Sequence, residues 1–136
     1  MIRSHRVARA AYQCVENRRQ EPNKKKNGAI AHKLPGMILQ NGLAQATGFL
    51  LAKGGGSDGQ HFLDLLDDLN AVLHAGDPQF NVANREALHL AIIGADLAQT
   101  LKLTRAALDA SGWIKRYVQG VLRVTATGDE SNGKED

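Results

Sequence analysis

A chain of 136 residues with a single cysteine has the length of one domain, and one thiol excludes an internal disulfide. Only 4% of the residues are aromatic while Ala, Leu and Gly are frequent, which favours close-packed helices over a β-sheet. No run of about 18 apolar residues predicts a membrane span and no signal peptide is recognisable, so we expect a soluble, cytoplasmic protein without a membrane partner.

The formal charge of +3 is unevenly distributed along the chain. Residues 1–53 carry ten Lys or Arg against two Asp or Glu, whereas residues 54–94 carry one against six. Such polarity is typical either of a basic face that binds a polyanion or of an ordinary mixed surface. We predict an all-α fold, a compact single-domain bundle of five to six helices over residues 1–123, followed by an acidic, flexible tail at residues 124–136.

The first predicted helix spans residues 2–20 and is amphipathic and basic. Its apolar side consists of Val7, Ala11, Cys14 and Val15. On that side we expect Cys14 to be a buried, inert thiol. Pro22 ends the helix, because the residue before a proline is displaced from helical angles. Residues 24–28, which include Lys24, Lys25 and Lys26, are then expected to form an exposed basic loop.

A central helix is predicted over residues 34–51, after a short helical turn at residues 29–33. Pro35 suits the first turn of a helix, because it has no N–H to lose. One helical face is predicted to contain Leu39, Leu43, Ala46 and Leu50, which recur at steps of four, three and four residues. Gly42 and Gly48 each cost about 1 kcal/mol in a helix interior, and close approach of a neighbouring helix is the simplest compensation.

The clearest amphipathic pattern begins at about Gln60, after a glycine-rich connector at residues 53–59. The connector lacks the order Gly-Lys-Ser/Thr after a strand that a phosphate-binding loop needs. One face of the helix contains Phe62, Leu65, Leu66, Leu69 and Leu73, and the outside is expected to contain Asp64, Asp67 and Asp68. Turn residues at 76–78 end this helix, and a short helix over residues 84–93 follows with Asn84 as its N-cap.

The last and longest predicted helix covers residues 95–123, which contain no proline. Its predicted apolar arc contains Leu97, Leu101, Leu103, Ala107, Leu108, Ile114, Val118, Val121 and Leu122. At about 100° per residue, Arg105, Arg116 and Arg123 fall within about 20° of one another on the opposite side, with Lys102 about 40–60° further round. This arrangement predicts a basic stripe about 27 Å long, the scale of several nucleotides. Lys115 lies inside the apolar arc and is expected to lie at its edge or to meet a partner.

No constellation in the sequence resembles an active site. Glu86 and His89 have the i, i+3 spacing of helical di-metal centres, but such centres need a second pair and two further glutamates. No Cys/His cluster with the spacing of zinc ligands occurs either. Trp113, at the margin of the last helix's apolar arc, is expected to be packed. We therefore predict no catalytic residue, no metal and no cofactor.

Several short segments together resemble the small subunit of the CRISPR type III-B Cmr effector complex. The main ones are residues 41–46 (NGLAQA) with Phe49 and Leu50, residues 103–108 (LTRAAL) and residues 113–117 (WIKRY), while residues 31–35 (AHKLP) and 11–12 (AY) also fit. The likeness extends over residues 1–123, in the order and spacing of the family. The chain departs from the family at Ala106, usually acidic, and at Thr47 and Gly48, usually larger and apolar.

The resemblance implies a non-catalytic, all-helical subunit of an RNA-guided, RNA-targeting antiviral complex. It implies contacts with backbone and large subunits, with guide and target RNA, and with further copies of the chain stacked along the backbone filament. The candidate RNA-binding residues are Lys24, Lys25, Lys26, Lys33, Lys102, Arg105, Arg116 and Arg123, and the candidate partner contacts are Asn41, Gln45 and Lys115. The alternatives are a free-standing basic helical module that binds nucleic acid and a small helical enzyme with a metal at Glu86 and His89.

Overall fold

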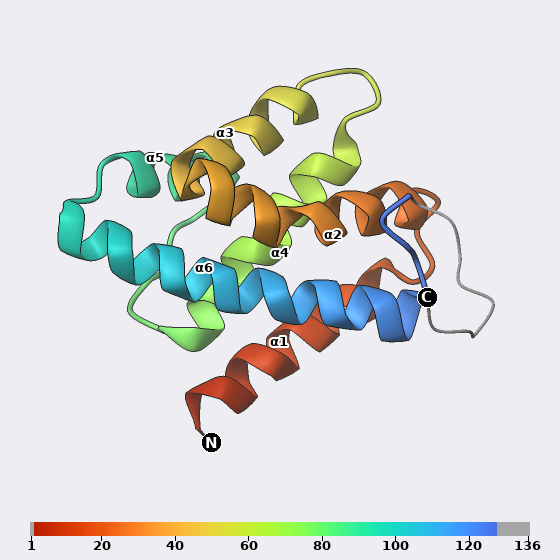
Figure 1. The fold of residues 1–136 in the computed structure, drawn as a ribbon, viewed down its shortest axis with the longest axis horizontal. Helices are drawn as coiled ribbons and strands as arrows, with labels where there is room; N and C mark the ends of the chain where they lie inside the picture. Colours follow the sequence, from red (N-terminus) through yellow and green to blue (C-terminus); the bar gives the residue numbers. More distant parts are fainter. Residues whose placement is uncertain (1, 128–136) are drawn as a thin grey trace.

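The computed structural model describes residues 2–127, and within them the chain forms six α-helices and a π-helical turn (Figure 1). The helices are α1 (Arg3–Arg18), α2 (Lys24–Asn41), α3 (Leu43–Gly54), α4 (Gln60–Gly76), α5 (Arg85–Ile93) and α6 (Leu97–Tyr117), and the π-helical turn is Val118–Leu122. No β-strand occurs in residues 2–127, so the prediction of an all-α bundle with a long C-terminal helix is confirmed. Of the predicted acidic tail, residues 128–136 lie outside the described part.

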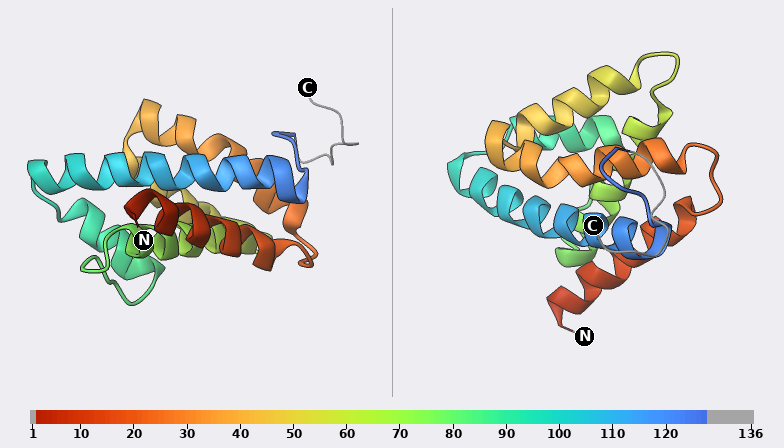
Figure 2. Two further views of the ribbon diagram at one scale, coloured as in Figure 1. Left: turned by 90° about the horizontal axis from the view of Figure 1, so that it is seen from below. Right: turned by 45° about the vertical axis from the view of Figure 1, so that its right-hand side comes forward.

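Helix α4 forms the centre of the bundle, because it packs against all five other α-helices. Helices α2 and α6 run side by side in opposite directions, and α1 packs against both α4 and α6 (Figures 1 and 2). The largest fully buried leucines come from four helices: Leu34, Leu50, Leu65, Leu66, Leu69 and Leu88. The interior is thus built from aliphatic side chains of helical faces, as the scarcity of aromatic residues predicted.

The predicted loop at residues 24–28 is wrong, because these residues form the first turns of α2. Asn27 is buried, and its Nδ2 donates a hydrogen bond to the carbonyl oxygen of His61 at 3.1 Å. Gly28 faces Val124, so closely that a Cβ at this position would lie 2.6 Å from Val124 Cγ1. The helix begins early because this close approach and this hydrogen bond fasten its first turns to the rest of the bundle.

The predicted helix over residues 34–51 is divided in two by Gly42. Gly42 has φ +90° and ψ 157°, a conformation that L side chains rarely adopt, and it separates α2 from α3. Pro35 therefore lies inside α2 rather than at a helix start. Leu39, placed by the periodicity on the buried face, is exposed, whereas Leu43, Ala46 and Leu50 are buried as predicted. Gly48 does meet a neighbouring helix, since its Cβ position lies 3.4 Å from Cε1 of His89 on α5.

The apolar faces of α1 and α4 and the start of α5 follow the predictions closely. Val7, Ala11, Cys14 and Val15 are all buried on α1. Asn84 caps α5, with its Oδ1 accepting a hydrogen bond from the Ala87 N–H at 2.8 Å. The expected outward position of the α4 aspartates is wrong for Asp64 and Asp68, both of which are buried.

We expect the thiol of Cys14 to be unreactive in the folded chain. Burial, and then the neighbouring Asp68 charge, raise the pKa of Cys14 from 9.0 to about 12, so almost no thiolate is present at pH 8. Titration with Ellman's reagent at pH 8 should detect about one thiol per chain in 6 M guanidinium chloride and close to none in buffer. Rapid labelling of the native chain would contradict this assignment.

Candidate nucleic-acid interface

Helix α6 holds three of the predicted RNA-binding residues on its outer side. Its inner side is buried against the bundle through Leu103, Ala107, Ala110 and Ile114. Lys102, Arg105 and Arg116 are exposed, and we call these three residues the basic stripe. At 1.5 Å per residue, the stripe extends about 21 Å along the helix axis. Packing of the inner side therefore fixes the direction in which these cationic side chains project.

The apolar arc of α6 is narrower than predicted at the N-terminal end of the helix. Leu97 and Leu101 were expected in the arc but are exposed, whereas Leu103 begins the buried part. The first turn of α6 extends past the helices that cover the remainder of its inner side (Figure 1).

Arg123 does not continue the basic stripe. The α-helical geometry ends at Tyr117, a π-helical turn follows, and Arg123 has φ +57°, in the left-handed region. The predicted 27 Å stripe is therefore wrong in its last member, because the wider turn changes the angular position of every residue after it. Arg123 remains exposed, but its direction is set by the turn and not by the α6 periodicity.

The cations of the basic stripe differ in their surroundings. Lys102 Nζ lies 3.5 Å from Asp77 Oδ2, and Arg105 has no ion-pair partner in residues 2–127. The Arg116 guanidinium lies over the Trp113 ring, 5.2 Å from its centroid, and Trp113 stacks on Tyr117 at 5.7 Å. Trp113 is half-buried, which agrees with its predicted packing role.

The first turns of α2, which contain Lys24, Lys25 and Lys26, lie at the end of the molecule where α6 ends (Figure 1). Lys25, Lys26 and Lys33 are exposed and Lys24 is half-buried. Lys26 is engaged in an ion pair with Asp58. His32, next to Lys33, donates a hydrogen bond from Nε2 to the carbonyl oxygen of Val124 at 2.6 Å. This bond brings Lys33 and Arg123, which adjoin the two bonded residues, into one region.

The predicted partner contacts lie in two separate places. Asn41 and Gln45 are exposed on either side of the Gly42 break, and Lys115 is half-buried on α6. Asn41 and Gln45 are thus close along the chain, at the end of α2 and the start of α3, whereas Lys115 belongs to another helix.

A groove of about 550 Å³ runs beside the first half of α6. Its lining includes Leu73 and Phe80, and Arg3, Lys102 and Arg105 lie along it. The Arg3 guanidinium is 3.6 Å from Asp109 Oδ2, so the charges of the rim are partly paired within the chain. Part of the basic stripe thus borders an apolar-floored groove, which the sequence did not indicate.

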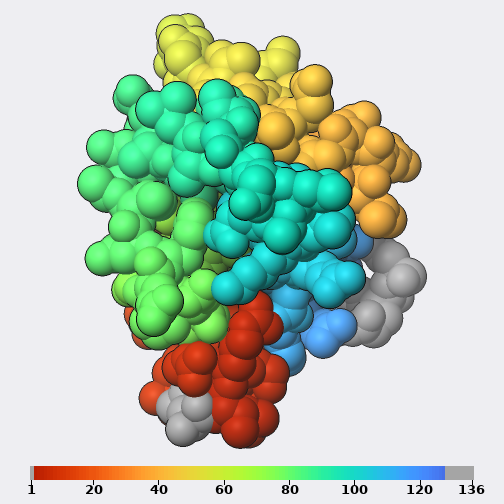
Figure 3. All heavy atoms as spheres, turned by 90° about the vertical axis from the view of Figure 1, so that its left-hand side faces the viewer, coloured from red at the N-terminus to blue at the C-terminus, as the bar shows by residue number. Residues whose placement is uncertain are grey.

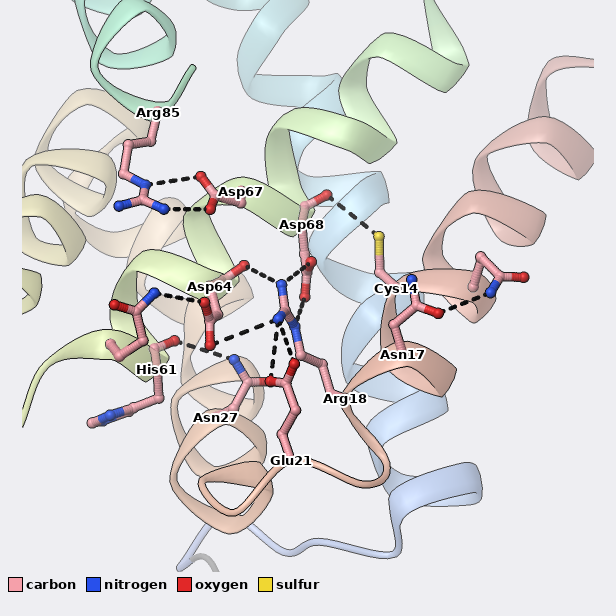
Figure 4. Close-up of polar contacts among 12 residues, drawn as sticks. Cys14, Asn17, Arg18, Glu21, Asn27, His61, Asp64, Asp67, Asp68 and Arg85 are labelled. Carbon is pink, nitrogen blue, oxygen red and sulfur yellow. Dashed lines mark hydrogen bonds and ion pairs between the residues drawn. The ribbon is translucent and has the colours of Figure 1, made fainter. Parts of the chain in front are cut away.

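The sequence also did not reveal a partly buried ion cluster around Arg18 (Figure 4). Arg18 Nη2 and Nε donate to the two carboxylate oxygens of Asp68 at 2.8 and 3.1 Å, and Nη1 lies 3.1 Å from Glu21 Oε2. Nη1 is also 3.7 Å from Asp64 Oδ2. The i, i+3 spacing of Arg18 and Glu21 is the only part of the cluster that the sequence indicates, because Asp64 and Asp68 are about 50 positions away. This cluster explains why two aspartates of α4 face inward.

The electrostatics of this cluster follow from burial and pairing. Burial raises the pKa of Asp68 from 3.8 to about 6, against the hydrogen bond and charge of Arg18, which act in the opposite direction. Burial alone would lower the pKa of Arg18, but the hydrogen bond and charge of Asp68 raise it above its ordinary value. Arg18 therefore stays protonated and holds the three carboxylates in structural contacts.

One member of the suggested metal pair on α5, His89, has a structural hydrogen bond, whereas Glu86 is exposed. His89 Nδ1 is hydrogen-bonded to Thr47 Oγ1 at 2.7 Å, which ties α5 to α3. Within residues 2–127 no group of three His, Cys, Asp or Glu side chains is placed to hold a metal ion. None of the helices in residues 2–127 combines the length and the hydrophobicity that a membrane span requires.

The comparisons with known proteins find relatives of this chain in one family. Residues 3–121 match the model of the family described as CRISPR-associated protein (Cas_Cmr5). The chain belongs to this family. A relative from Thermus thermophilus, the CRISPR system Cmr subunit Cmr5, is 32% identical over 121 residues, which cover 88% of this chain and 96% of the relative.

The fold of the Cmr5 family is seen directly in a solved structure. The crystal structure of a CRISPR-associated Cmr5 family protein from Thermus thermophilus matches with a TM-score of 0.76 and 31% sequence identity. The match covers 90% of this chain and 99% of that chain. The resemblance to the Cmr small subunit and the all-α architecture are thereby confirmed.

Proposed function

We propose that this chain is a non-catalytic small subunit of a type III-B CRISPR Cmr complex and helps to line the groove in which guide and target RNA pair. In this proposal its partners are the backbone and large subunits, both RNAs, and further copies of the chain stacked along the backbone filament. The complex acts in the cytoplasm against foreign RNA. Family membership over residues 3–121 supports a role in such an assembly.

The basic stripe is the single observation on which the RNA-binding part of the proposal depends. Lys102, Arg105 and Arg116 project from a helix whose opposite side is anchored in the core, so their cationic groups are held in a row. Arginine and lysine bind phosphates without reading sequence, and pairing between guide and target supplies specificity. Lys24, Lys25, Lys26, Lys33 and Arg123 are proposed as further phosphate contacts at the other end of the same helix pair.

Several side chains that could supply chemistry are engaged in structural contacts or buried, which supports the non-catalytic part. Asp64 and Asp68 are paired with Arg18, and burial raises the pKa of the Cys14 thiol to about 12. Cleavage of the target is therefore assigned in this proposal to neighbouring subunits.

Charge reversal on the basic stripe tests the proposal. In the assembled complex, Arg105→Glu with Arg116→Glu should reduce target-RNA affinity roughly 10- to 100-fold, because both residues would face phosphates. The slope of log affinity against log salt concentration should become shallower by the amount expected for about two phosphate contacts. Assembly should persist, since neither side chain is buried. Filter binding over a salt series measures the affinity, and gel filtration measures the assembly.

A matched control carries Arg19→Glu with Lys53→Glu, which changes the net charge equally but at the C-cap of α1 and on α3. An equal loss of affinity in the control, or lost assembly with unchanged affinity in the test variant, would contradict the proposal. Tight, salt-sensitive RNA binding by the isolated chain would instead favour the free-standing module.

A further inference from the structure

Four large aliphatic side chains are exposed on α5 and on the beginning of α6, the two helices that residues 94–96 connect. Leu90 is 63%, Ile93 55%, Leu97 75% and Leu101 53% exposed, and we call these four residues the apolar patch. They account for half of the eight large hydrophobic residues exposed in residues 2–127. Figure 3 looks onto this end of the molecule, where α5 and the beginning of α6 form the middle of the face. Single exposed leucines are ordinary, whereas a contiguous group marks an interaction surface.

The geometry of the apolar patch suits a helix as the bound element. Leu90 and Ile93 are three positions apart on α5, and Leu97 and Leu101 are four apart on α6, so each pair forms a short ridge. Leu101 also lines the 550 Å³ groove, whose wall includes Phe80 and Leu73. A helix lying against the two ridges could place one side chain in that groove, as in helix-in-groove recognition.

The charges within the apolar patch and at its α5 edge are acidic, which argues against RNA as the occupant of that edge, whereas Arg3, Lys102 and Arg105 line the groove on its α6 side. The only charged side chains between residues 86 and 101 are Glu86 and Asp96. Glu86 lies one helical turn before Leu90, and Asp96 immediately precedes Leu97 as the N-cap of α6. Lys102, the first cation after the patch, is paired with Asp77. A polyanion would meet two carboxylates and an aliphatic surface here.

A second copy of this chain fits the apolar patch poorly in either arrangement. Two patches face to face would bring Glu86 and Asp96 of both copies into one contact, which like charges disfavour. A head-to-tail contact would offer the basic end of the next copy, yet residues 13–38, which contain the four α2 lysines, have no large hydrophobic residue exposed. That end supplies the charge but not the apolar surface.

We propose that the apolar patch docks an amphipathic helix of a different protein subunit, one with aliphatic side chains three or four positions apart and a Lys or Arg at its edge. The aliphatic side chains cover the four residues of the patch, and the cation meets Glu86. The inference rests on one part of the proposed function, namely that the chain works within a multi-subunit complex. It does not depend on RNA binding by the basic stripe.

Site-directed photocrosslinking in the complete complex identifies the occupant. The photoreactive amino acid p-benzoylphenylalanine replaces Leu97 in the test sample and Ser57, in the exposed connector before α4, in the control. After irradiation, mass spectrometry should locate the Leu97 crosslink on a helical segment of another subunit with the stated aliphatic and basic pattern. A crosslink to a second copy, to RNA or to a segment without that pattern would overturn the proposal, as would no yield above the Ser57 control.

Substitutions in the apolar patch provide a second, independent test of docking. Leu90→Gln with Leu97→Gln should weaken association with the remaining subunits at least about tenfold while leaving the melting temperature of the isolated chain unchanged. Leu39→Gln, on α2 outside the patch and as exposed as Leu97 at 75%, should leave association unchanged. Glu86→Lys should weaken association in the same direction.

The outcomes separate this inference from the proposed function. Unchanged association of a correctly folded Leu90→Gln, Leu97→Gln variant overturns the docking proposal, even where reversal of Arg105 and Arg116 lowers RNA affinity as expected. If the Leu90→Gln, Leu97→Gln variant loses association, the docking proposal is supported. The RNA-binding role of the basic stripe is then tested separately, by the charge reversal of Arg105 and Arg116. If the Leu90→Gln, Leu97→Gln variant melts at a lower temperature, its association no longer tests docking, and the crosslink from position 97 decides whether the patch contacts another subunit.

Discussion

Replacing Arg18 with alanine is expected to lower the free energy of unfolding by about 3–5 kcal/mol, because it leaves buried carboxylates without their cation. Asp68 and Asp64 are both buried on α4 and rely on the Arg18 guanidinium, which also bridges to Glu21. Urea unfolding followed by circular dichroism measures the change. The cost includes both the lost hydrogen bonds and the charges that remain desolvated.

The neighbouring residue supplies the control for this prediction. Arg19→Ala removes the same kind of side chain from the end of α1, but Arg19 is largely exposed and pairs with Glu16 at 3.3 Å, so a loss of about 0.5 kcal/mol or less is expected. Adding Asp68→Asn to the Arg18→Ala chain should restore part of the stability, since it removes one uncompensated charge. Equal losses for Arg18→Ala and Arg19→Ala would show that the cluster contributes nothing specific.

Replacing Leu69 with alanine should cost about 3–5 kcal/mol, because it opens a cavity at the centre of the bundle. Leu69 is completely buried on α4, the helix that contacts every other α-helix. The matched control is Leu90→Ala, the same change at an exposed position of the apolar patch, with an expected effect within about 0.5 kcal/mol. Denaturant midpoints of the two variants test the assignment of the core, and similar midpoints would refute it.

The sequence was sufficient to predict most of the helices and their buried faces, because their apolar residues recur with the helical period. Val7, Ala11, Cys14 and Val15 on α1 were found in this way, and the Asn84 cap of α5 followed from the N-cap preference of asparagine. The division at Gly42 was not predictable by the same means. A glycine within a periodic segment can either stay inside the helix, at a cost in stability, or end the helix by adopting a positive φ. The pattern of apolar residues does not distinguish these two cases.

The candidate site was predicted where α6 is regular and missed where the geometry changes. Arg105 and Arg116 project outward as the periodicity indicated, whereas Arg123 follows a π-helical turn that shifts the angular register. Leu97 and Leu101 were assigned to the core because periodicity identifies an apolar face but not the point at which neighbouring helices stop covering it. The inward aspartates of α4 were missed because their cation comes from another helix.

The anchoring of Val124 determines how the chain can be engineered. Its side chain lies against Gly28 and its carbonyl oxygen accepts from His32, so the backbone turns back onto α2 after α6. A label attached directly after Thr127 would therefore begin near the first turns of α2, beside the lysines proposed as phosphate contacts. Fusion at the start of α1, which lies at a different corner of the molecule (Figure 1), keeps that region open for measurement.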